Sequence, residues 1–263
     1  MTSIRTKVIN DAWSNRVRDS LRTLGYYYEP EFCTETIDAK PVVDAAKLLG
    51  RLHVPRGANR EKPVIITQPS PSAPDWRPFD RRASIGWHND FSTRRGRPEL
   101  SLSWIRREDP DALSGGAWRV VSVPKLLAEL GRTLEGHRLV SEFAKQAEAF
   151  GYRDAGGWYP FRIITKSDDG SGRLHSMRFY GRALEEGAWL RFGCVPERTR
   201  EIVARIEEAA DSVGEVLRAS TGTLLIVDNR FSLHDRLRQQ VTGPEDQRRQ
   251  AWLCFVRRLH KPL

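Results

Sequence analysis

Apolar residues spaced by three and four positions predict several helices along the chain. The first extends from about Ile9 to Leu24, and Gly25 stands where a left-handed residue would end it. The longest extends from Pro196 to Arg218, with proline near its start. Shorter helices are expected over the ranges 42–49, 124–134 and 138–150.

Compact runs of β-branched and aromatic residues predict strands between these helices. The run from Thr223 to Val227 is continuously apolar, so this strand should be buried on both faces. The stretch from Glu99 to Ile105 alternates polar and apolar residues, as a half-buried strand does. Further strands are expected over the ranges 26–28, 64–67, 117–121, 161–164, 177–180 and 251–256.

Two polar stretches predict irregular structure. Repeated prolines between Gln68 and Arg82 indicate a surface loop, which serves either as a plain connector or as one wall of a pocket. Lys166 to Gly172 has the composition of a turn. Many short strands with a few helices favour one α+β domain, mostly β in its core, built as a double sheet or barrel with peripheral helices.

Composition is that of an ordinary soluble globular protein. The chain has 263 residues, of which 39% are hydrophobic and 29% charged. No apolar run is long enough to span a membrane, and the polar N-terminus shows no secretory signal. The 3 cysteines are far apart and lack metal-binding spacing, which argues against a disulfide framework or a structural zinc site and favours a reducing cytoplasmic location.

The formal net charge of +9 leaves two interpretations open. Most of the positive charge is arginine, scattered in pairs rather than gathered in one run. This pattern is typical of solvated basic faces, and it also fits patches that bind an acidic ligand or nucleic acid. A nucleic-acid partner is therefore not expected from the charge, but it is not excluded by it.

The stretch Gly86-Trp87-His88-Asn89-Asp90-Phe91 carries the first candidate chemistry. Alternate residues of a strand share one face, so His88 and Asp90 can hold one ion together. His234 follows the buried strand at 223–227 and is the best candidate for a third ligand. Two histidines and one carboxylate suit Fe(II) with open coordination positions, and they also suit a zinc hydrolase. From spacing alone, the favoured interpretation is a hydrogen-bonded His88 that Asp90 orients, without a metal.

Two stretches together resemble the Fe(II)/2-oxoglutarate-dependent dioxygenases, in particular the superfamily of taurine dioxygenase and clavaminate synthase. Gly86 to Phe91 looks like that family's Trp-His-x-Asp. Gly222 to Arg236 looks like its Gly-Asp-Leu-Leu-hydrophobic-Asp-Asn followed by His-x-Arg. The resemblance implies a double-stranded β-helix, a jelly-roll with helices outside and the metal between two sheets. It also implies a single domain over 1–263, with an N-terminal cap over about 1–60 and a helical insert over about 124–150.

The resemblance assigns roles to particular residues. It makes His88, Asp90 and His234 the iron ligands, with 2-oxoglutarate and dioxygen as co-substrates. The family has an arginine on the strand after the distal histidine that pairs with the far carboxylate of 2-oxoglutarate. Arg248 and Arg249 both stand near that place, and Asp-x-Arg after a Gly-Pro turn slightly favours Arg248.

The chain departs from the family at two positions. Ala117 and Trp118 stand where many members have an acidic residue and a threonine that contacts 2-oxoglutarate, and Leu253 or Trp252 replaces a second arginine. Seven residues are candidates for lining a substrate pocket, although core packing is the favoured interpretation for each of them: Trp87, Asn89, Phe91, Trp104, Trp118, Tyr159 and Arg178. Arg236 either binds near the active site or closes a turn, and the sequence favours neither.

The sequence therefore predicts an oxygenase that hydroxylates an unactivated C–H bond of a small amino-acid-like or natural-product substrate in a biosynthetic reaction. Desaturation, cyclisation or epoxidation would use the same ligands, while the carboxylate Asp90 argues against halogenation. Two alternatives stay open: an oxygenase directed at nucleic acid or another macromolecule, and a jelly-roll protein that binds a ligand without turnover. Oligomeric state is not predicted.

Overall fold

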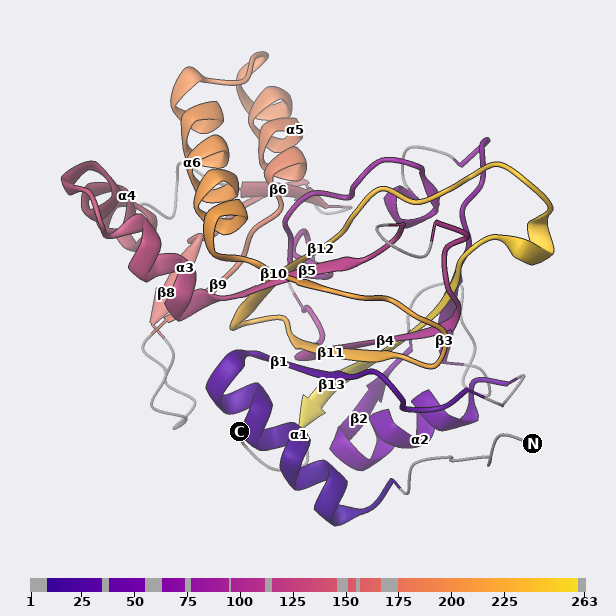
Figure 1. Cartoon of the computed structure of the whole chain (residues 1–263). Helices are drawn as coiled ribbons and strands as arrows, with labels where there is room; N and C mark the ends of the chain where they lie inside the picture. The colour runs from indigo at the N-terminus through magenta and orange to yellow at the C-terminus, as the bar shows by residue number, and fades with distance from the viewer. Residues whose placement is uncertain are drawn as a thin grey trace.

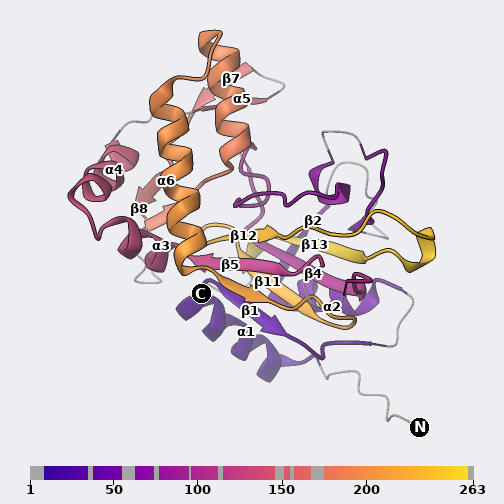
Figure 2. The same ribbon diagram turned by 45° about the horizontal axis from the view of Figure 1, so that its top comes forward.

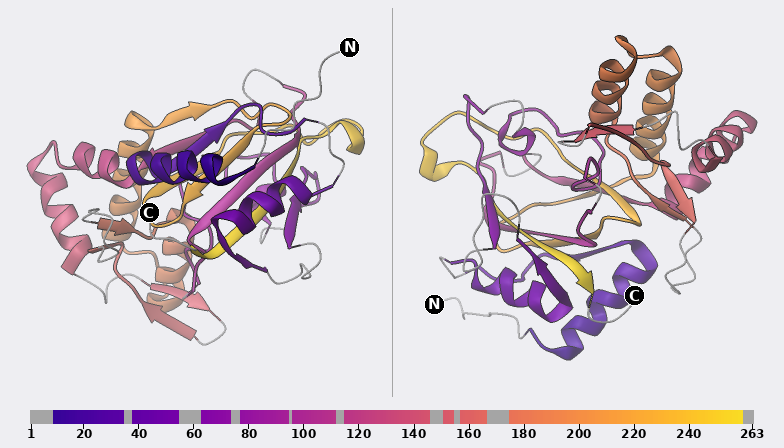
Figure 3. Two further views of the ribbon diagram at one scale, coloured as in Figure 1. Left: turned by 90° about the horizontal axis from the view of Figure 1, so that it is seen from below. Right: turned by 180° about the vertical axis from the view of Figure 1, so that it is seen from behind.

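The computed structural model describes residues 9–34, 38–54, 63–73, 77–94, 96–111, 115–145, 151–154, 157–166 and 175–259. Two antiparallel sheets lie one above the other in this structure, and helices cover their outer sides (Figure 1). Views from other directions show the same order of layers (Figures 2 and 3). The α+β class with a sheet-rich core, predicted from the sequence, is thus confirmed.

The larger sheet has six strands, and most of them come from the two ends of the chain. Its order is β1 (Tyr26–Glu29), β11 (Leu224–Asp228), β4 (Leu100–Arg107), β13 (Gln250–Leu259) and β2 (Gly50–His53), with β3 (Val64–Thr67) also paired to β13. Successive neighbours pair antiparallel. Ser103 of β4 lies opposite Leu225 of β11 on one side and opposite Leu253 of β13 on the other. This places β4 and the first part of β13 at the centre of the molecule.

The buried strand β11 packs on both of its faces, as its continuous apolar sequence predicts. Leu224 and Ile226 contact the cluster formed with α1 (Asp11–Leu24) and α2 (Lys40–Leu49). Leu225 and Val227 face the other way, toward the smaller sheet. At the end of α1, Gly25 takes φ +80°, the left-handed conformation that favours glycine.

The smaller sheet lies between the larger sheet and a group of helices. Its order is β10 (Glu215–Leu217), β5 (Trp118–Ser122) and β12 (Ser232–Arg236). The helices beyond it are α3 (Val123–Leu130), α4 (Leu134–Lys145), α5 (Gly181–Phe192) and α6 (Glu197–Val213). Two short antiparallel pairs complete the described strands: β6 (Gly151–Asp154) with β7 (Gly157–Pro160), and β8 (Ile164–Lys166) with β9 (His175–Met177). There are also two short 3-10 helices, η1 (Pro78–Asp80) and η2 (Glu245–Gln247).

Most predicted elements are present, and three differ. The helix expected to reach Arg218 ends at Val213: Gly214 has an extended backbone, and the next residues form β10, which pairs with β5. Gly214 also packs so closely on Trp87 that a Cβ there would lie 2.6 Å from the indole. The strands expected over 161–164 and 177–180 are displaced: β8 begins at Ile164 and β9 ends at Met177, so each shares only one residue with the predicted range. The backbone of Phe179 pairs with Asn89 instead.

Helix α5 was not predicted from the sequence. Its apolar residues do not form one stripe: Ala183, Leu184 and Ala188 are buried, while Trp189 and Phe192 are exposed. Most of the turn predicted over 166–172, and the end of the helix predicted over 138–150, lie outside the described residues. Among the described helices, none is both long enough and apolar enough to cross a membrane.

Candidate metal centre and cavity

The segment that contains His88 runs beside β12 at the edge of the smaller sheet. The backbone N–H of His88 donates to the carbonyl of His234 at 3.0 Å, and the N–H of His234 donates back to the carbonyl of His88 at 2.9 Å. This reciprocal pair brings two distant motifs into register. The two imidazole rings consequently lie with their centroids 4.4 Å apart.

Asp90 completes a group of three possible metal ligands. Its carboxylate lies 3.7 Å from His88 Nε2 and 3.4 Å from His234 Nε2, and one ligand atom from each residue falls within 4.8 Å of the others. These separations suit three ligands that share one ion at about 2.1 Å each. The structure therefore brings together all three residues that the sequence singled out.

The charges of the three side chains are coupled. Burial opposes ionisation of Asp90, but the two imidazoles outweigh it and hold the pKa of the carboxyl well below its ordinary value. Burial also disfavours charge on His88, yet Asp90 and the Gly86 carbonyl raise the pKa of His88. Burial and the neighbouring His88 lower the pKa of His234. The group thus presents an ionised carboxylate to two imidazoles, which is the donor set that a divalent cation requires.

The orientation of His88 is fixed by a chain of hydrogen bonds behind it. His88 Nδ1 lies 2.8 Å from the carbonyl oxygen of Gly86, which makes Nδ1 the donor and leaves Nε2 free to face Asp90. The N–H of Gly86 donates to Asp235 at 2.9 Å, and Asp235 also accepts from Ser84 Oγ at 2.7 Å and from Arg119 at 2.7 Å. Asp235 is fully buried. It therefore anchors the loop that carries His88.

Asn229 fixes the backbone of Asp90 in a similar way. Its side-chain oxygen accepts a hydrogen bond from the N–H of Asp90 at 3.1 Å. Its amide nitrogen donates to the carbonyl of Pro98 at 3.2 Å and to Ser101 Oγ at 2.7 Å. The asparagine of the second sequence motif is thus a structural link between the two motifs.

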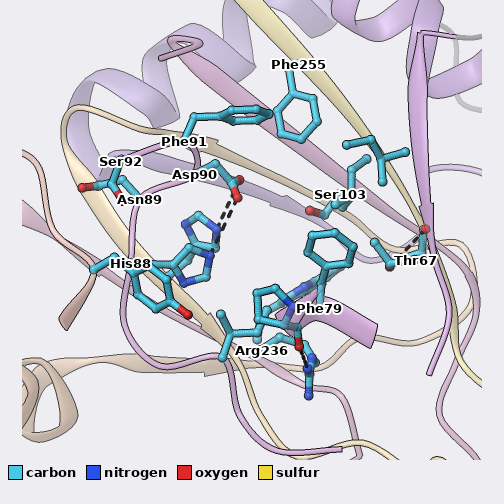
Figure 4. A pocket seen from close by; sticks show the side chains of 18 of the residues that line it. Thr67, Phe79, His88, Asn89, Asp90, Phe91, Ser92, Ser103, Arg236 and Phe255 are labelled. Atoms are coloured by element: carbon cyan, nitrogen blue, oxygen red, sulfur yellow. Dashed lines mark hydrogen bonds and ion pairs between the residues drawn. The ribbon is translucent and has the colours of Figure 1, made fainter. Parts of the chain in front are cut away.

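The three candidate ligands line one wall of a cavity of about 320 Å³ between the two sheets (Figure 4). In this view Phe91 and Phe255 lie on one side of the cavity, and Phe79 lies across from them. The floor comes from alternate residues of β13, namely Ala251, Leu253 and Phe255, and from Arg249 just before this strand. A cavity of this size suits a small molecule.

Of the two candidate arginines, the structure places Arg249 in the cavity and Arg248 outside it. The guanidinium of Arg248 hydrogen-bonds to the carbonyls of Gly243 at 2.9 Å and Pro69 at 3.3 Å, on the outer side of the loop. Arg249 shares the cavity-facing parity of Ala251 and Leu253. The slight preference for Arg248 was therefore wrong about which side chain enters the cavity, because neighbouring residues on an extended chain point to opposite sides.

Arg249 is buried without a protein counter-ion. Its side chain is 3% exposed, it forms no hydrogen bond or ion pair with any described residue, and its Nε is a buried donor without a partner. Burial lowers the pKa of Arg249 to about 9, which still leaves it protonated at neutral pH. Its Cζ lies 6.0 Å from the ring centre of Trp118. A buried, unpaired guanidinium that faces a cavity is a binding group for an anion.

Gly116 makes room for this arginine. It has φ +64°, and a Cβ at this position would lie 2.5 Å from Arg249 Cδ and 2.6 Å from its Nε. A side chain larger than glycine would thus be strained and would also displace the guanidinium.

Arg236 also borders the cavity, but its terminal nitrogens are already engaged. They donate to the carbonyls of Ala83 at 2.8 Å, Leu237 at 2.9 Å, Arg81 at 3.0 Å and Pro78 at 3.1 Å. These bonds hold the loop around η1 against β12. Burial lowers the pKa of Arg236 to about 10. Arg236 thus shapes one wall of the cavity, a contribution that His-x-Arg spacing alone does not reveal.

The remaining predicted pocket residues divide into two groups. Phe91 and Trp118 line the cavity, as predicted. Trp87 does not line the cavity and instead fits the favoured interpretation of core packing: it is buried among the helices on the far face and donates from Nε1 to Asp211 at 2.7 Å. Asn89 touches the cavity, but its side-chain oxygen and nitrogen are bonded to Phe179 at 2.8 Å and Ser232 at 2.6 Å.

Two further candidates lie elsewhere. Trp104 fits the favoured interpretation of core packing, since it lies in the cluster with α1 and α2 and donates to the carbonyl of Cys33 at 3.0 Å. The guanidinium of Arg178 lies over Phe161 and does not border the cavity. Nothing in the structure describes the side chain of Tyr159.

Several lining residues were missed by the sequence reasoning. Tyr180 forms a backbone bridge with His88, and its ring centre lies 5.6 Å from that of His88. Phe79 lies on the proline-rich loop, for which a pocket wall was one of two interpretations. Ser103 and Thr67 face the cavity from β4 and β3. The alternation of faces along the strand could have identified Ser103 as a cavity residue, whereas no pattern in the neighbouring sequence indicates this for Tyr180 or Phe79.

Comparisons with known proteins agree with the architecture. No protein-family model matches the chain, and no curated protein does. Among solved structures, an asparagine oxygenase in complex with Fe(II), 3-hydroxyasparagine and succinate has a TM-score of 0.65 at 16% identity, covering 94% of this chain and 84% of that one. A putative α-ketoglutarate-dependent taurine dioxygenase from Burkholderia xenovorans has a TM-score of 0.64 at 15% identity, covering 97% and 87%.

A third solved structure is similar over most of the chain. The non-heme iron oxygenase OrfP, in complex with Fe, succinate and (3S)-hydroxy-L-Arg, has a TM-score of 0.58 at 14% identity, covering 94% of this chain and 80% of that one. The chain therefore shares the fold of these oxygenases over nearly its whole length. The resemblance that the two sequence motifs indicated is confirmed at the level of the fold.

Proposed function

We propose that this protein is a non-haem Fe(II)- and 2-oxoglutarate-dependent oxygenase with a double-stranded β-helix core. One observation carries the proposal: a single cavity holds both the His88, Asp90 and His234 group and the unpaired guanidinium of Arg249. The first is a donor set for a divalent metal, and the second is a site for a carboxylate. The oxygenases that share the fold, which were crystallised with iron and either succinate or α-ketoglutaric acid, support this combination.

The residues fit an iron site with open coordination positions. Three ligands on one side of an ion leave room for a co-substrate and dioxygen, whereas a structural zinc site has four protein ligands. No fourth histidine, cysteine or carboxylate joins the group among the described residues. When bound, iron together with 2-oxoglutarate and dioxygen would supply the oxidant that hydroxylates a C–H bond of the substrate.

The chain's own residues prepare this chemistry. Gly86 and Asp235 hold His88 with Nε2 facing Asp90, and Asn229 holds the backbone of Asp90. Arg249 would bind the far carboxylate of 2-oxoglutarate, with Trp118 against its guanidinium. Because the donors are fixed before any ligand binds, little reorganisation is needed on binding. The neighbours whose names contain asparagine or hydroxyarginine support a small, amino-acid-like substrate.

Anaerobic addition of Fe(II) and 2-oxoglutarate tests the proposal. We expect a weak visible charge-transfer band and, after oxygen is admitted, formation of succinate. His234→Ala should lose both signals because it removes one of three ligands. His137→Ala is the matched control, since His137 is exposed on α4 and lies outside the cavity. A wild-type protein that gives neither band nor succinate would refute the assignment.

The same measurements address the alternatives that the sequence left open. A non-catalytic ligand-binding protein would not retain iron stoichiometrically. An oxygenase directed at nucleic acid would form succinate and would also bind RNA or DNA in a salt-dependent gel shift. The small cavity favours a small-molecule substrate over a macromolecular one.

A further inference from the structure

The charge of the cavity restricts what can bind there. Among the described residues that line it, Asp90 is the only carboxylate, and it belongs to the metal group. Three arginines, Arg94, Arg236 and Arg249, border the same space. A cationic substrate group would therefore meet positive charge with no acidic partner, whereas an anionic group would find one.

The three arginines are not equivalent. Arg236 is engaged by four backbone carbonyls, and Arg249 is assigned to the co-substrate under the proposed function. Arg94 is exposed, and within the described residues its guanidinium forms neither a hydrogen bond nor an ion pair. Arg94 is thus the cation that is left for the substrate.

Arg94 is also tied to the metal group through the backbone. It follows Asp90 by four residues, and its N–H donates to the carbonyl of Phe91 at 2.9 Å. The N–H of Ser92 donates to the carbonyl of Asn89 at 3.3 Å within the same turn. This short turn keeps the base of the Arg94 side chain at the rim of the cavity, close to the candidate iron ligands.

Several of the other lining residues near the metal group are apolar or aromatic, beside uncharged polar residues such as Ser103 and Thr67. The rings of Phe91 and Phe255 meet edge to face with centroids 5.0 Å apart (Figure 4). Phe91 has φ +56°, a left-handed conformation that is rare for a bulky residue. A second edge-to-face contact with His53, at 5.3 Å, holds the ring in this place. Phe79, Ile85 and Leu253 extend the apolar lining.

We propose that the substrate is an amphipathic monoanion, with an apolar or aromatic body against Phe91 and Phe255 and a carboxylate on Arg94. This inference rests on the proposed function, because it reserves Arg249 for 2-oxoglutarate. It distinguishes this protein from an enzyme that acts on a guanidinium-bearing substrate, for which the described lining offers no acidic side chain beyond Asp90.

Three probes of one shape test the substrate class: 3-phenylpropionate, its neutral amide 3-phenylpropanamide and the cationic 3-phenylpropan-1-amine. Each is titrated by calorimetry into protein loaded anaerobically with Fe(II) and 2-oxoglutarate. We expect the carboxylate to bind at least about tenfold more tightly than the amide, and the amine to bind most weakly, since a charge-assisted pair adds about one order of magnitude or more to affinity. In Arg94→Gln the carboxylate should lose this advantage, while the Kd of the amide stays unchanged.

Arg138→Gln is the matched control, because Arg138 is exposed on α4 and does not border the cavity. It should leave all three affinities unchanged. Tighter binding of the amine than of the carboxylate overturns the proposal, and so does a carboxylate preference that persists in Arg94→Gln. If the charge-transfer band forms normally but the carboxylate has no preference, only the substrate class fails. If the charge-transfer band never forms, the proposed function is refuted, and this inference is refuted with it because it depends on that function.

Discussion

Replacement of Arg249 by methionine should make the protein more stable while it abolishes binding of 2-oxoglutarate. Methionine is similar in length and keeps the packing beside Gly116, but it has no charge. The change removes a buried cation that forms no ion pair with a described residue, although the charge of Asp109 partly offsets the cost of its burial. Stability and function therefore oppose each other at this position.

The size of the effect follows from the burial of Arg249. Burial, and to a lesser degree Arg236, lowers the pKa of Arg249 from 12.5 to about 9. At about 1.4 kcal/mol per unit, this fall corresponds to at most about 5 kcal/mol of unfavourable free energy in the folded protein. Its sign is destabilising at neutral pH, because the group is protonated in both states and the penalty is relieved only as pH rises from about 9 toward 12.5.

Two effects reduce the expected gain. Methionine loses the contact between the guanidinium and Trp118, which is worth about 1 kcal/mol. Water in the cavity also solvates part of the wild-type charge. We therefore expect Arg249→Met to gain about 2 kcal/mol, which raises Tm by about 4–8 °C for a chain of this size.

Thermal melts with and without Fe(II) and 2-oxoglutarate, under argon, measure both effects. At 2-oxoglutarate concentrations of about 100 times Kd, the wild type should gain about 2.7 kcal/mol, and Arg249→Met should gain nothing beyond the effect of metal alone. Arg248→Met is the control and should keep the full ligand effect, because Arg248 points out of the cavity. A less stable Arg249→Met protein that still responds to 2-oxoglutarate would refute the reasoning.

Two further predictions concern groups outside the cavity. Asp235→Asn should weaken Fe(II) binding by about 10- to 100-fold, because it loosens the Gly86 loop behind His88. A metal titration followed by the charge-transfer band measures this affinity. Unchanged affinity would show that Asp235 serves only the packing of Arg119. In the native protein only the thiol of exposed Cys194 should react rapidly with a disulfide reagent at pH 8. Cys33 and Cys254 are buried, and burial raises the pKa of Cys254 to about 12. A colorimetric titration that finds two or more rapidly reacting thiols would contradict this.

The metal group could be predicted from sequence because each motif is continuous along the chain. Strand parity predicts one shared face for His88 and Asp90, and the two side chains do lie together although His88 forms only an isolated bridge and Asp90 lies in the turn after it. His234 lies in β12, the strand that follows the apolar run of β11. The same parity places Trp87 opposite His88, so the sequence already contained the signal that excludes Trp87 from the cavity. Core packing was the favoured interpretation for these aromatic residues, and the face that each one occupies separates Trp87 in the core from Phe91 at the cavity.

Other features depend on partners that are far apart in sequence. Asp235 reaches Gly86, which lies 149 residues earlier, and Tyr180 reaches His88 from a segment with no strand of its own. The choice between Arg248 and Arg249 depends on where β13 begins, and the register of β13 shifts between Gln250 and Ala251. Local patterns do not specify such a shift, since it arises from pairing with β4.

The departure at Ala117 and Trp118 can now be explained by the packing around Arg249. The sequence resemblance suggested that a threonine contact to 2-oxoglutarate was missing there. In the structure Trp118 borders the cavity, and its ring lies beside the guanidinium, while Gly116 leaves space for the arginine side chain. The carboxylate end of the cavity is thus built by packing an aromatic ring against Arg249, and no protein acceptor among the described residues uses up its donors. An arginine that is held by packing keeps its hydrogen-bonding capacity for the ligand, so the loss of a hydroxyl at this position does not by itself argue against 2-oxoglutarate as co-substrate.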